Sequence, residues 1–116
     1  MDIVMYHNPS CSKSRQTLSL LEEHGVAPTL VLYLETIPSI DDLKSVYAQL
    51  GFTTVRSMMR TKEDQYKTLN LKDDTLTDLQ LFTAMHNCPK LIERPIVIAN
   101  NQAKIGRPPE QVLAIL

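Results

Sequence analysis

Near its amino terminus the chain reads His7-Asn8-Pro9-Ser10-Cys11-Ser12-Lys13-Ser14-Arg15, a polar run between an apolar segment, residues 3–6, and a segment with helical periodicity. Unpaired backbone N–H groups at the start of a helix favour a thiolate, and Lys13 and Arg15 add positive charge there. The same N–H groups form an anion site. The run therefore predicts a reactive cysteine beside a site for an oxyanion; the alternative is that Cys11 is a small buried hydrophobe.

Outward from this run, the pattern predicts a β-α-β unit. Residues 2–6 are typical of a buried strand, and residues 12–24 are typical of a helix that ends at Gly25. Residues 29–34 are β-branched and apolar, which predicts a second strand. Because the crossover in such a unit is almost always right-handed, we expect the two strands to be parallel neighbours.

The middle of the chain is predicted to be helical. One helix begins at Ser39, where Asp42 stands three residues later as in a capping box, and another begins at Thr75 with Asp78 in the same position. Residues 53–74 are polar and mixed, and they predict short helices between these two.

Two strands and a helix are predicted at the carboxyl end. Residues 95–99 and 102–105 flank Asn100-Asn101, a pair that tolerates the positive φ angles of a two-residue hairpin turn. A last helix opens within residues 106–110, with inward-facing side chains expected at Val112, Leu113 and Leu116.

The predicted order is β-α-β, a helical insertion, then β-β-α. This is the order of the thioredoxin-like fold, an α/β fold with a four-stranded mixed sheet and a reactive cysteine at the start of its first helix. A chain of 116 residues is long enough for one core and not for two, so residues 1–116 are predicted to form a single domain.

The composition narrows the function classes. A net charge of −1 gives no reason to expect a nucleic-acid partner. The chain has no apolar window of about 18 residues and no secretion signal, so we expect no membrane association and a cytoplasmic location. Cys11 and Cys88 lie far apart and fit no metal-binding or dithiol spacing, so both are expected to be free thiols.

Four motifs in order carry a resemblance to a known family. The run from His7 to Arg15 matches the signature His-Asn-Pro-x-Cys-x-x-Ser-Arg at every defined position. Three arginines match further on: Arg60 after two methionines, Arg94 before a proline, and Arg107 before two prolines. Over essentially its whole length the chain resembles the ArsC family of glutaredoxin-coupled arsenate reductases, especially the small bacterial members.

The resemblance implies a monothiol enzyme that reduces arsenate. The Cys11 thiolate would attack arsenate held by Arg60, Arg94 and Arg107, and a guanidinium suits this role because its planar fork of N–H donors grips oxyanions bidentately. Glutathione would then attack the arsenylated cysteine as a co-substrate, glutaredoxin would reduce the mixed disulfide, and arsenite would leave. No metal or bound organic cofactor is implied, and we expect a monomer.

Other residues have supporting roles in this hypothesis. Pro95 resembles the cis-proline that thioredoxin-like proteins place beside the active-site cysteine. His7 is either a protonated imidazole that favours the thiolate or an exposed loop histidine, and Ser14 either hydrogen-bonds the Cys11 sulfur or lies on the helix surface. Cys88 is interpreted as a passive thiol, with a resolving cysteine as the alternative.

Two departures from the family pattern leave other functions open. The best-known members have glycine and threonine where this chain has Ser12 and Lys13, which puts arsenate as the true substrate in doubt. One alternative is a transcriptional regulator of the Spx type, but such proteins generally sense oxidants through a Cys-x-x-Cys pair, and Ser14 stands at the second position. Another is a glutathione-dependent thiol-disulfide reductase, which would use Cys11 without the three arginines.

Overall fold

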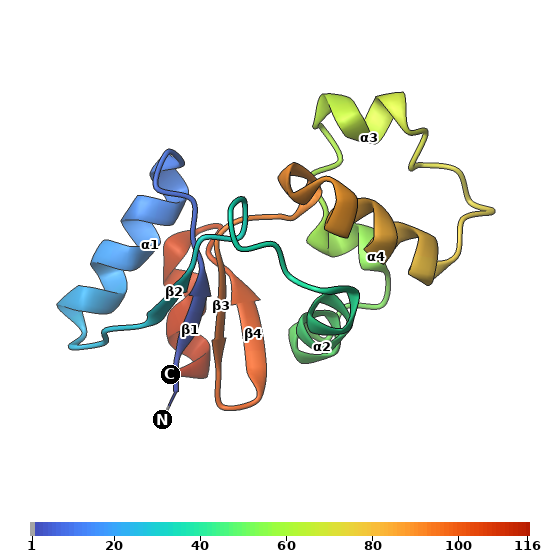
Figure 1. Ribbon diagram of the computed structural model, residues 1–116. Coiled ribbons are helices and arrows are strands. Elements are labelled where there is room, and N and C mark those ends of the chain that lie inside the picture. The colour runs from blue at the N-terminus through green and yellow to red at the C-terminus, as the bar shows by residue number, and fades with distance from the viewer. Residues whose placement is uncertain (1) are drawn as a thin grey trace.

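A four-stranded sheet lies between two unequal groups of helices in the computed structural model, which describes residues 2–116 (Figure 1). The strands are short, and the helices between β2 and β3 form the long insertion that the sequence predicts. The elements in chain order are β1 (Val4–Tyr6), α1 (Ser12–Glu23), β2 (Thr29–Val31), α2 (Ile40–Leu50), the 3₁₀ helix η1 (Val55–Met58), α3 (Asp64–Thr68), α4 (Asp78–Asn87), η2 (Pro89–Leu91), β3 (Ile96–Ala99), β4 (Gln102–Ile105) and η3 (Pro109–Ile115).

The sheet has the strand order β2-β1-β3-β4. β1 is parallel to β2 and antiparallel to β3, and β3 and β4 form an antiparallel hairpin. Asn100 and Asn101 occupy the hairpin turn with φ angles of 54° and 60°, as their residue types predict. The thioredoxin-like fold, with its mixed sheet and helical insertion, is therefore confirmed.

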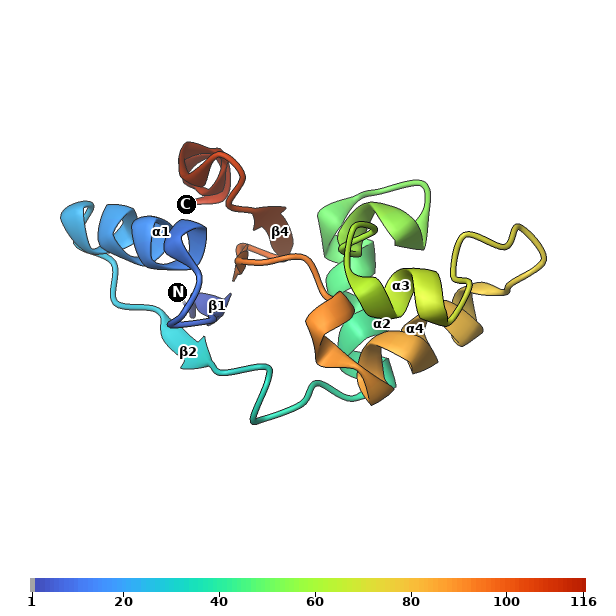
Figure 2. The same cartoon turned by 90° about the horizontal axis from the view of Figure 1, so that it is seen from above.

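Each face of the sheet carries its own hydrophobic cluster. Alternation along β1 sends Met5 to one face and Tyr6 to the other. Met5 packs with side chains of α1 and η3, whereas Tyr6 joins the cluster of the helical insertion. Seen from above, α1 and η3 lie on one side of the strands and α2, α3 and α4 on the other (Figure 2).

The second strand is shorter than predicted. We expected residues 29–34, but β2 ends at Val31, whose carbonyl accepts the backbone N–H of His7 at 2.9 Å. The chain then turns, because the carbonyl of Leu32 accepts the N–H groups of both Glu35 and Thr36. The turn carries Tyr33 into the interior, where it is 1% exposed.

The N-cap of α2 is the predicted residue, whereas the N-cap of α4 lies two residues after the predicted one. Ser39 and Asp42 form the expected capping box of α2, but α4 is capped by Thr77 with Gln80. The predicted cap, Thr75, is occupied elsewhere, since the Asp73 carboxylate accepts both its N–H and its hydroxyl. That local turn delays the helix.

The last helix is a 3₁₀ helix, and this changes which side chains it buries. Val112 is buried as predicted, but its inward partner is Ile115 rather than Leu113 or Leu116, and Leu116 is 37% exposed. Three residues per turn place positions 112 and 115 on one face, whereas the prediction assumed the α-helical period.

In residues 2–116, every helix is too short or too polar to cross a bilayer.

Gly106 follows β4 where that strand meets α1. A Cβ atom there would lie 2.5 Å from Thr17 Oγ1 and 2.9 Å from Pro95 Cγ. Thr17 is fully buried, and its hydroxyl donates to the carbonyl of Lys13 at 2.9 Å, so it has little room to move. The glycine therefore lets the end of β4 approach α1 closely.

Gly106→Ala should lower the free energy of unfolding by about 1–3 kcal/mol, because the added methyl group overpacks this contact. Urea denaturation measures the change. Ser45→Ala, at an exposed position of α2, is the control and should change stability by less than about 0.5 kcal/mol. Equal stability of Gly106→Ala and wild type would show that Thr17 moves aside without cost.

Candidate active site

Strand pairing brings three distant segments to one edge of the sheet. Tyr6, the last residue of β1, pairs with Ile96, the first of β3, and Ile96 also pairs with Ile105 at the end of β4. The residues just beyond these ends therefore lie together. They carry Cys11, Arg94 and Arg107 respectively.

A fourth segment joins the same edge from the helical insertion. The backbone N–H of Arg60 donates to the carbonyl of Leu91 at 2.8 Å, and that of Glu93 donates to the carbonyl of Met58 at 2.9 Å. These two hydrogen bonds tie the segment after η1 to the approach to β3. Arg60 is thereby brought to the site that holds Arg94.

Cys11 is the N-cap residue of α1 and is 8% exposed. The loop before it is held by the backbone N–H of Cys11, which donates to the carbonyl of Asn8, and by that of Ser10, which donates to Asn8 Oδ1, both at 3.0 Å. Nη2 of Arg107 lies 3.8 Å from the Cys11 sulfur. Asn8 therefore shapes the turn, as its residue type predicts.

The pKa of the Cys11 thiol lies below its ordinary value. Burial raises this pKa, but the backbone N–H of Ser14, the charge of Arg94, the backbone N–H of Lys13 and the charge of Arg107 together lower it by more. Hydrogen-bond donors at the helix start and two guanidinium groups thus outweigh the cost of desolvation. The structure gives physical support to a reactive thiolate at Cys11.

His7 corresponds to neither of the two alternatives that the sequence left open. It is 5% exposed, so it is not an exposed loop histidine, and burial together with the charge of Arg15 lowers its pKa, which favours the neutral imidazole. Its Nδ1 lies 2.7 Å from the hydroxyl of Ser14, which also accepts the backbone N–H of Asn8 at 3.0 Å. His7 therefore positions the loop, and its lowered pKa disfavours the charged imidazole beside Cys11.

Ser14 and Arg15 also differ from the expectation. The Ser14 hydroxyl faces His7, so Ser14 acts on the Cys11 sulfur through its backbone N–H instead. Arg15 donates from Nη1 to the carbonyl of Pro9 at 2.9 Å, so it also holds the loop. Both side chains maintain the conformation of the segment that carries the nucleophile.

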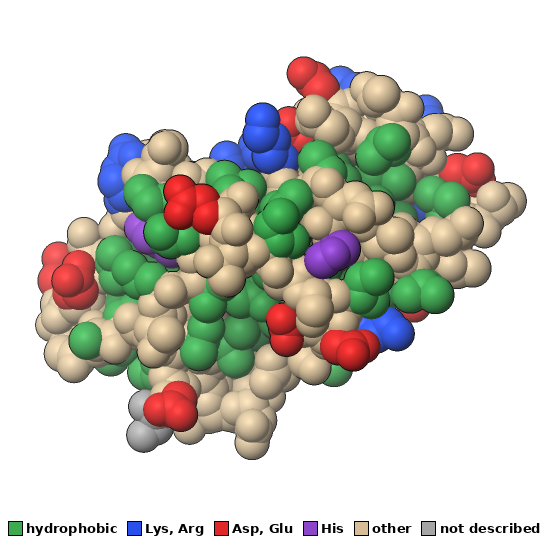
Figure 3. All heavy atoms as spheres, in the orientation of Figure 1, with side chains coloured by type: hydrophobic (Ala, Val, Ile, Leu, Met, Phe, Trp, Pro, Cys, Tyr) green, Lys and Arg blue, Asp and Glu red, His purple; other side chains and the backbone are tan. Residues whose placement is uncertain are grey.

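The three predicted arginines line one cavity. Arg60, Arg94 and Arg107 share it with Thr61, Lys62 and Glu93, and we name it the oxyanion pocket. Figure 3 shows Lys and Arg side chains gathered along the upper edge of the molecule, where the start of α1 faces the helical insertion.

The arginines differ in their partners. Arg60 pairs with Glu63 at 2.9 Å, and Arg107 Nε donates to the carbonyl of Arg94 at 2.7 Å and lies 3.3 Å from the carboxylate of Glu93. Arg94 is the exception: within residues 2–116, its Nε and Nη1 are buried and have no hydrogen-bond partner.

Sequence reasoning missed three residues of the site. Glu63 stands three residues after Arg60, a spacing that signals an ion pair, but Glu93 gave no such signal because its partner lies in another segment. Tyr33 is buried near Cys11 and Arg94, and burial raises its pKa to about 12, although the charge of Arg94 opposes the shift. Its phenol therefore stays protonated.

Two proline bonds border the site. The Arg94–Pro95 bond is cis, as the resemblance implied, and the Arg107–Pro108 bond is also cis, which the sequence did not indicate.

Cys88 caps the end of α4, packs against the cluster of the helical insertion and is a free thiol, as is Cys11. Cys88 therefore belongs to the helical core and not to the loop that carries the nucleophile.

In a Cys88→Ser background, Cys11 should be alkylated by iodoacetamide with a pH midpoint below about 8.5, because its pKa is lowered. Arg107→Gln should raise that midpoint by removing a nearby positive charge, while Lys90→Gln, at an exposed position, should leave it unchanged. The measurement is the alkylation rate against pH. A midpoint at or above 8.5 in the wild-type loop would contradict the activation of the thiol.

Comparison with known proteins places this chain in a family. The model of the ArsC family matches residues 6–115. The arsenate reductase of Haemophilus influenzae is 53% identical over 116 residues, which are the whole of both chains. An uncharacterized protein of Escherichia coli, YfgD, is 55% identical over 114 residues, 98% of this chain and 96% of the other.

Solved structures agree with these relatives. The arsenate reductase from Vibrio cholerae superimposes with a TM-score of 0.99 at 62% identity, covering 100% of this chain and 98% of the other. A putative arsenate reductase from Yersinia pestis does so with a TM-score of 0.94 at 62% identity, covering 98% of this chain and 100% of the other. Because the family model matches residues 6–115, which is nearly the whole chain, this chain belongs to the ArsC family.

Proposed function

We propose that this protein reduces arsenate to arsenite through the thiolate of Cys11. The observation that carries the proposal is the guanidinium of Arg94, whose Nε and Nη1 are buried without a partner in residues 2–116. Buried charged donors without acceptors are costly, and an incoming oxyanion would satisfy them. Because the charge of Arg94 also lowers the pKa of Cys11, that oxyanion would bind beside the nucleophile.

The charge of the oxyanion pocket suits a tetrahedral dianion. Four cations, Arg60, Lys62, Arg94 and Arg107, line it, and two carboxylates, Glu63 and Glu93, pair with two of them. Two positive charges therefore remain in excess. Relatives in Haemophilus influenzae and Vibrio cholerae that are named arsenate reductases support arsenate as the substrate.

The first step of the proposed reaction joins arsenic to the enzyme. The Cys11 thiolate attacks arsenic, a sulfur–arsenic bond forms, and one arsenate oxygen takes up protons and leaves as water. Guanidinium groups stabilise the negative charge on the remaining oxygens, which is the role of preorganised donors in group transfer. Arsenic is still in its pentavalent state after this step.

An external thiol completes the reduction. The glutathione thiolate attacks the Cys11 sulfur and forms a disulfide, while the electron pair of the sulfur–arsenic bond passes to arsenic, which leaves as trivalent arsenite. A glutaredoxin thiol then attacks the glutathione sulfur and releases the Cys11 thiolate. Glutathione is consumed as a co-substrate, and the protein carries no bound cofactor in this scheme.

Substitution of an arginine in the oxyanion pocket can distinguish an arsenate reductase from a glutathione-dependent thiol-disulfide reductase. Arg94→Lys keeps the charge but loses the planar fork, so kcat/KM for arsenate should fall by roughly 10²-fold. The assay is arsenate-dependent NADPH oxidation with glutathione, glutathione reductase and glutaredoxin. Disulfide exchange has no oxyanion to hold, so full activity of Arg94→Lys would count against the proposal.

Arg56→Lys is the matched control for Arg94→Lys. The Arg56 guanidinium donates to the backbone carbonyls of Leu71 and Asp73 at 3.0 and 2.7 Å, outside the oxyanion pocket. This control should leave the KM for arsenate unchanged even if it lowers stability. A rise in KM with Arg94→Lys alone therefore identifies loss of anion binding.

A monothiol mechanism predicts different roles for the two cysteines. Cys88→Ser should remain active, because Cys88 packs in the helical core, while Cys11→Ser should be inactive. Mass spectrometry of Cys88→Ser, trapped during turnover without glutaredoxin, should detect glutathione on Cys11. A Cys11–Cys88 disulfide in the wild type together with an inactive Cys88→Ser would instead establish Cys88 as a resolving cysteine.

A further inference from the structure

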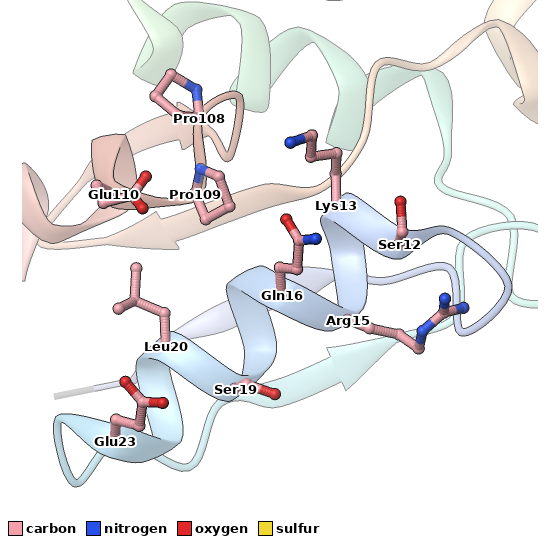
Figure 4. Close-up of a pocket in the computed structure, with 10 residues that line it drawn as sticks. All are labelled: Ser12, Lys13, Arg15, Gln16, Ser19, Leu20, Glu23, Pro108, Pro109 and Glu110. Atoms are coloured by element: carbon pink, nitrogen blue, oxygen red, sulfur yellow. The ribbon is translucent and has the colours of Figure 1, made fainter.

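A second cavity is lined from Ser12, the residue after Cys11, and shares no lining residue with the oxyanion pocket. It is a groove of about 660 Å³ between the first turns of α1 and the start of η3 (Figure 4). Lys13, Gln16 and Leu20 project from α1 into it, at positions that share one face of the helix. The segment Pro108–Glu110 forms the opposite wall.

Each wall of this groove adjoins a residue that contacts Cys11. On the α1 side, the backbone N–H of Lys13 lowers the pKa of Cys11 through a hydrogen bond. On the other side, Arg107 directly precedes Pro108, and its Nη2 lies 3.8 Å from the sulfur. Arg107 also lines the oxyanion pocket, so the residue that contacts the sulfur connects that pocket with the wall that begins at Pro108.

The charges of the groove are balanced, unlike those of the oxyanion pocket. Lys13 and Arg15 contribute two cations, and Glu23 and Glu110 contribute two carboxylates. Within residues 2–116, neither Lys13 nor Glu110 belongs to an ion pair, although they stand on opposite walls. An unpaired ammonium facing an unpaired carboxylate complements a zwitterion better than it complements a simple anion.

We propose that this groove binds the γ-glutamyl end of glutathione, the thiol that the proposed function requires. That end is an amino acid head group, with an α-carboxylate suited to Lys13 and an α-ammonium suited to Glu110. The amide of Gln16 can hydrogen-bond either group, and Leu20 with Pro108 contributes apolar surface for the methylene carbons. Bound in this way, the co-substrate presents its thiol at the end of the groove formed by Ser12, the residue after Cys11.

The kinetic test separates the two substrates. Gln16→Ala and Glu110→Gln should each raise the KM for glutathione roughly tenfold, the effect of losing a contact of about 1.4 kcal/mol, without changing the KM for arsenate. With N-acetylcysteine, which lacks the γ-glutamyl head group, each variant should match the wild type. The control variants are Lys44→Ala and Glu22→Gln, at exposed positions outside the groove, and both should leave the KM for glutathione unchanged.

A binding test does not depend on arsenate. Titration of the ¹⁵N-labelled protein with S-methylglutathione, which cannot react with Cys11, should shift the amide signals of Lys13, Gln16 and Glu110, and Glu110→Gln should weaken the effect. Arsenate turnover with neither these shifts nor the rise in KM would overturn the groove assignment and keep the proposed function. Shifts without any arsenate turnover would keep the assignment and overturn the proposed function.

Discussion

The antiparallel pairing of β3 with both β1 and β4 is the constraint on which the site depends. It places the end of β1, the start of β3 and the end of β4 at one edge of the sheet, through the pairs Tyr6 with Ile96 and Ile96 with Ile105. Cys11 and Arg107 are 96 residues apart in the chain, yet Nη2 of Arg107 lies 3.8 Å from the Cys11 sulfur. Strand pairing thus brings side chains from separate parts of the chain together at one end of the sheet.

Electrostatic balance then decides what each charged group can do. Glu63 and Glu93 compensate Arg60 and Arg107, which limits the repulsion among neighbouring guanidinium groups. Within residues 2–116, Nε and Nη1 of Arg94 are instead buried without a hydrogen-bond partner. Burial alone would hold Cys11 as a neutral thiol, and its lowered pKa reflects the combined action of helix N–H groups and arginines.

Local sequence signals predicted well where no competing interaction was present. The capping box of Ser39 and the turn at Asn100-Asn101 each form as their residue types indicate. Thr75 failed as a helix cap because the Asp73 carboxylate had already bound its N–H and hydroxyl. The last helix was predicted with the wrong period, because it is a 3₁₀ helix with three residues per turn, packed against α1 and β4.

The sequence by itself determined the order of the elements and the cysteine at a strand–helix junction, because periodicity and turn residues are local properties, and its resemblance to the ArsC family indicated the three arginines. Only the tertiary structure decided that His7 is buried and its imidazole favoured in the neutral form, that Glu93 pairs with Arg107, and that a groove of balanced charge lies between α1 and the start of η3. Each of these depends on desolvation and on distances between segments far apart in the chain. Burial and the distances between these segments are defined only once the strands have paired and the helices have packed.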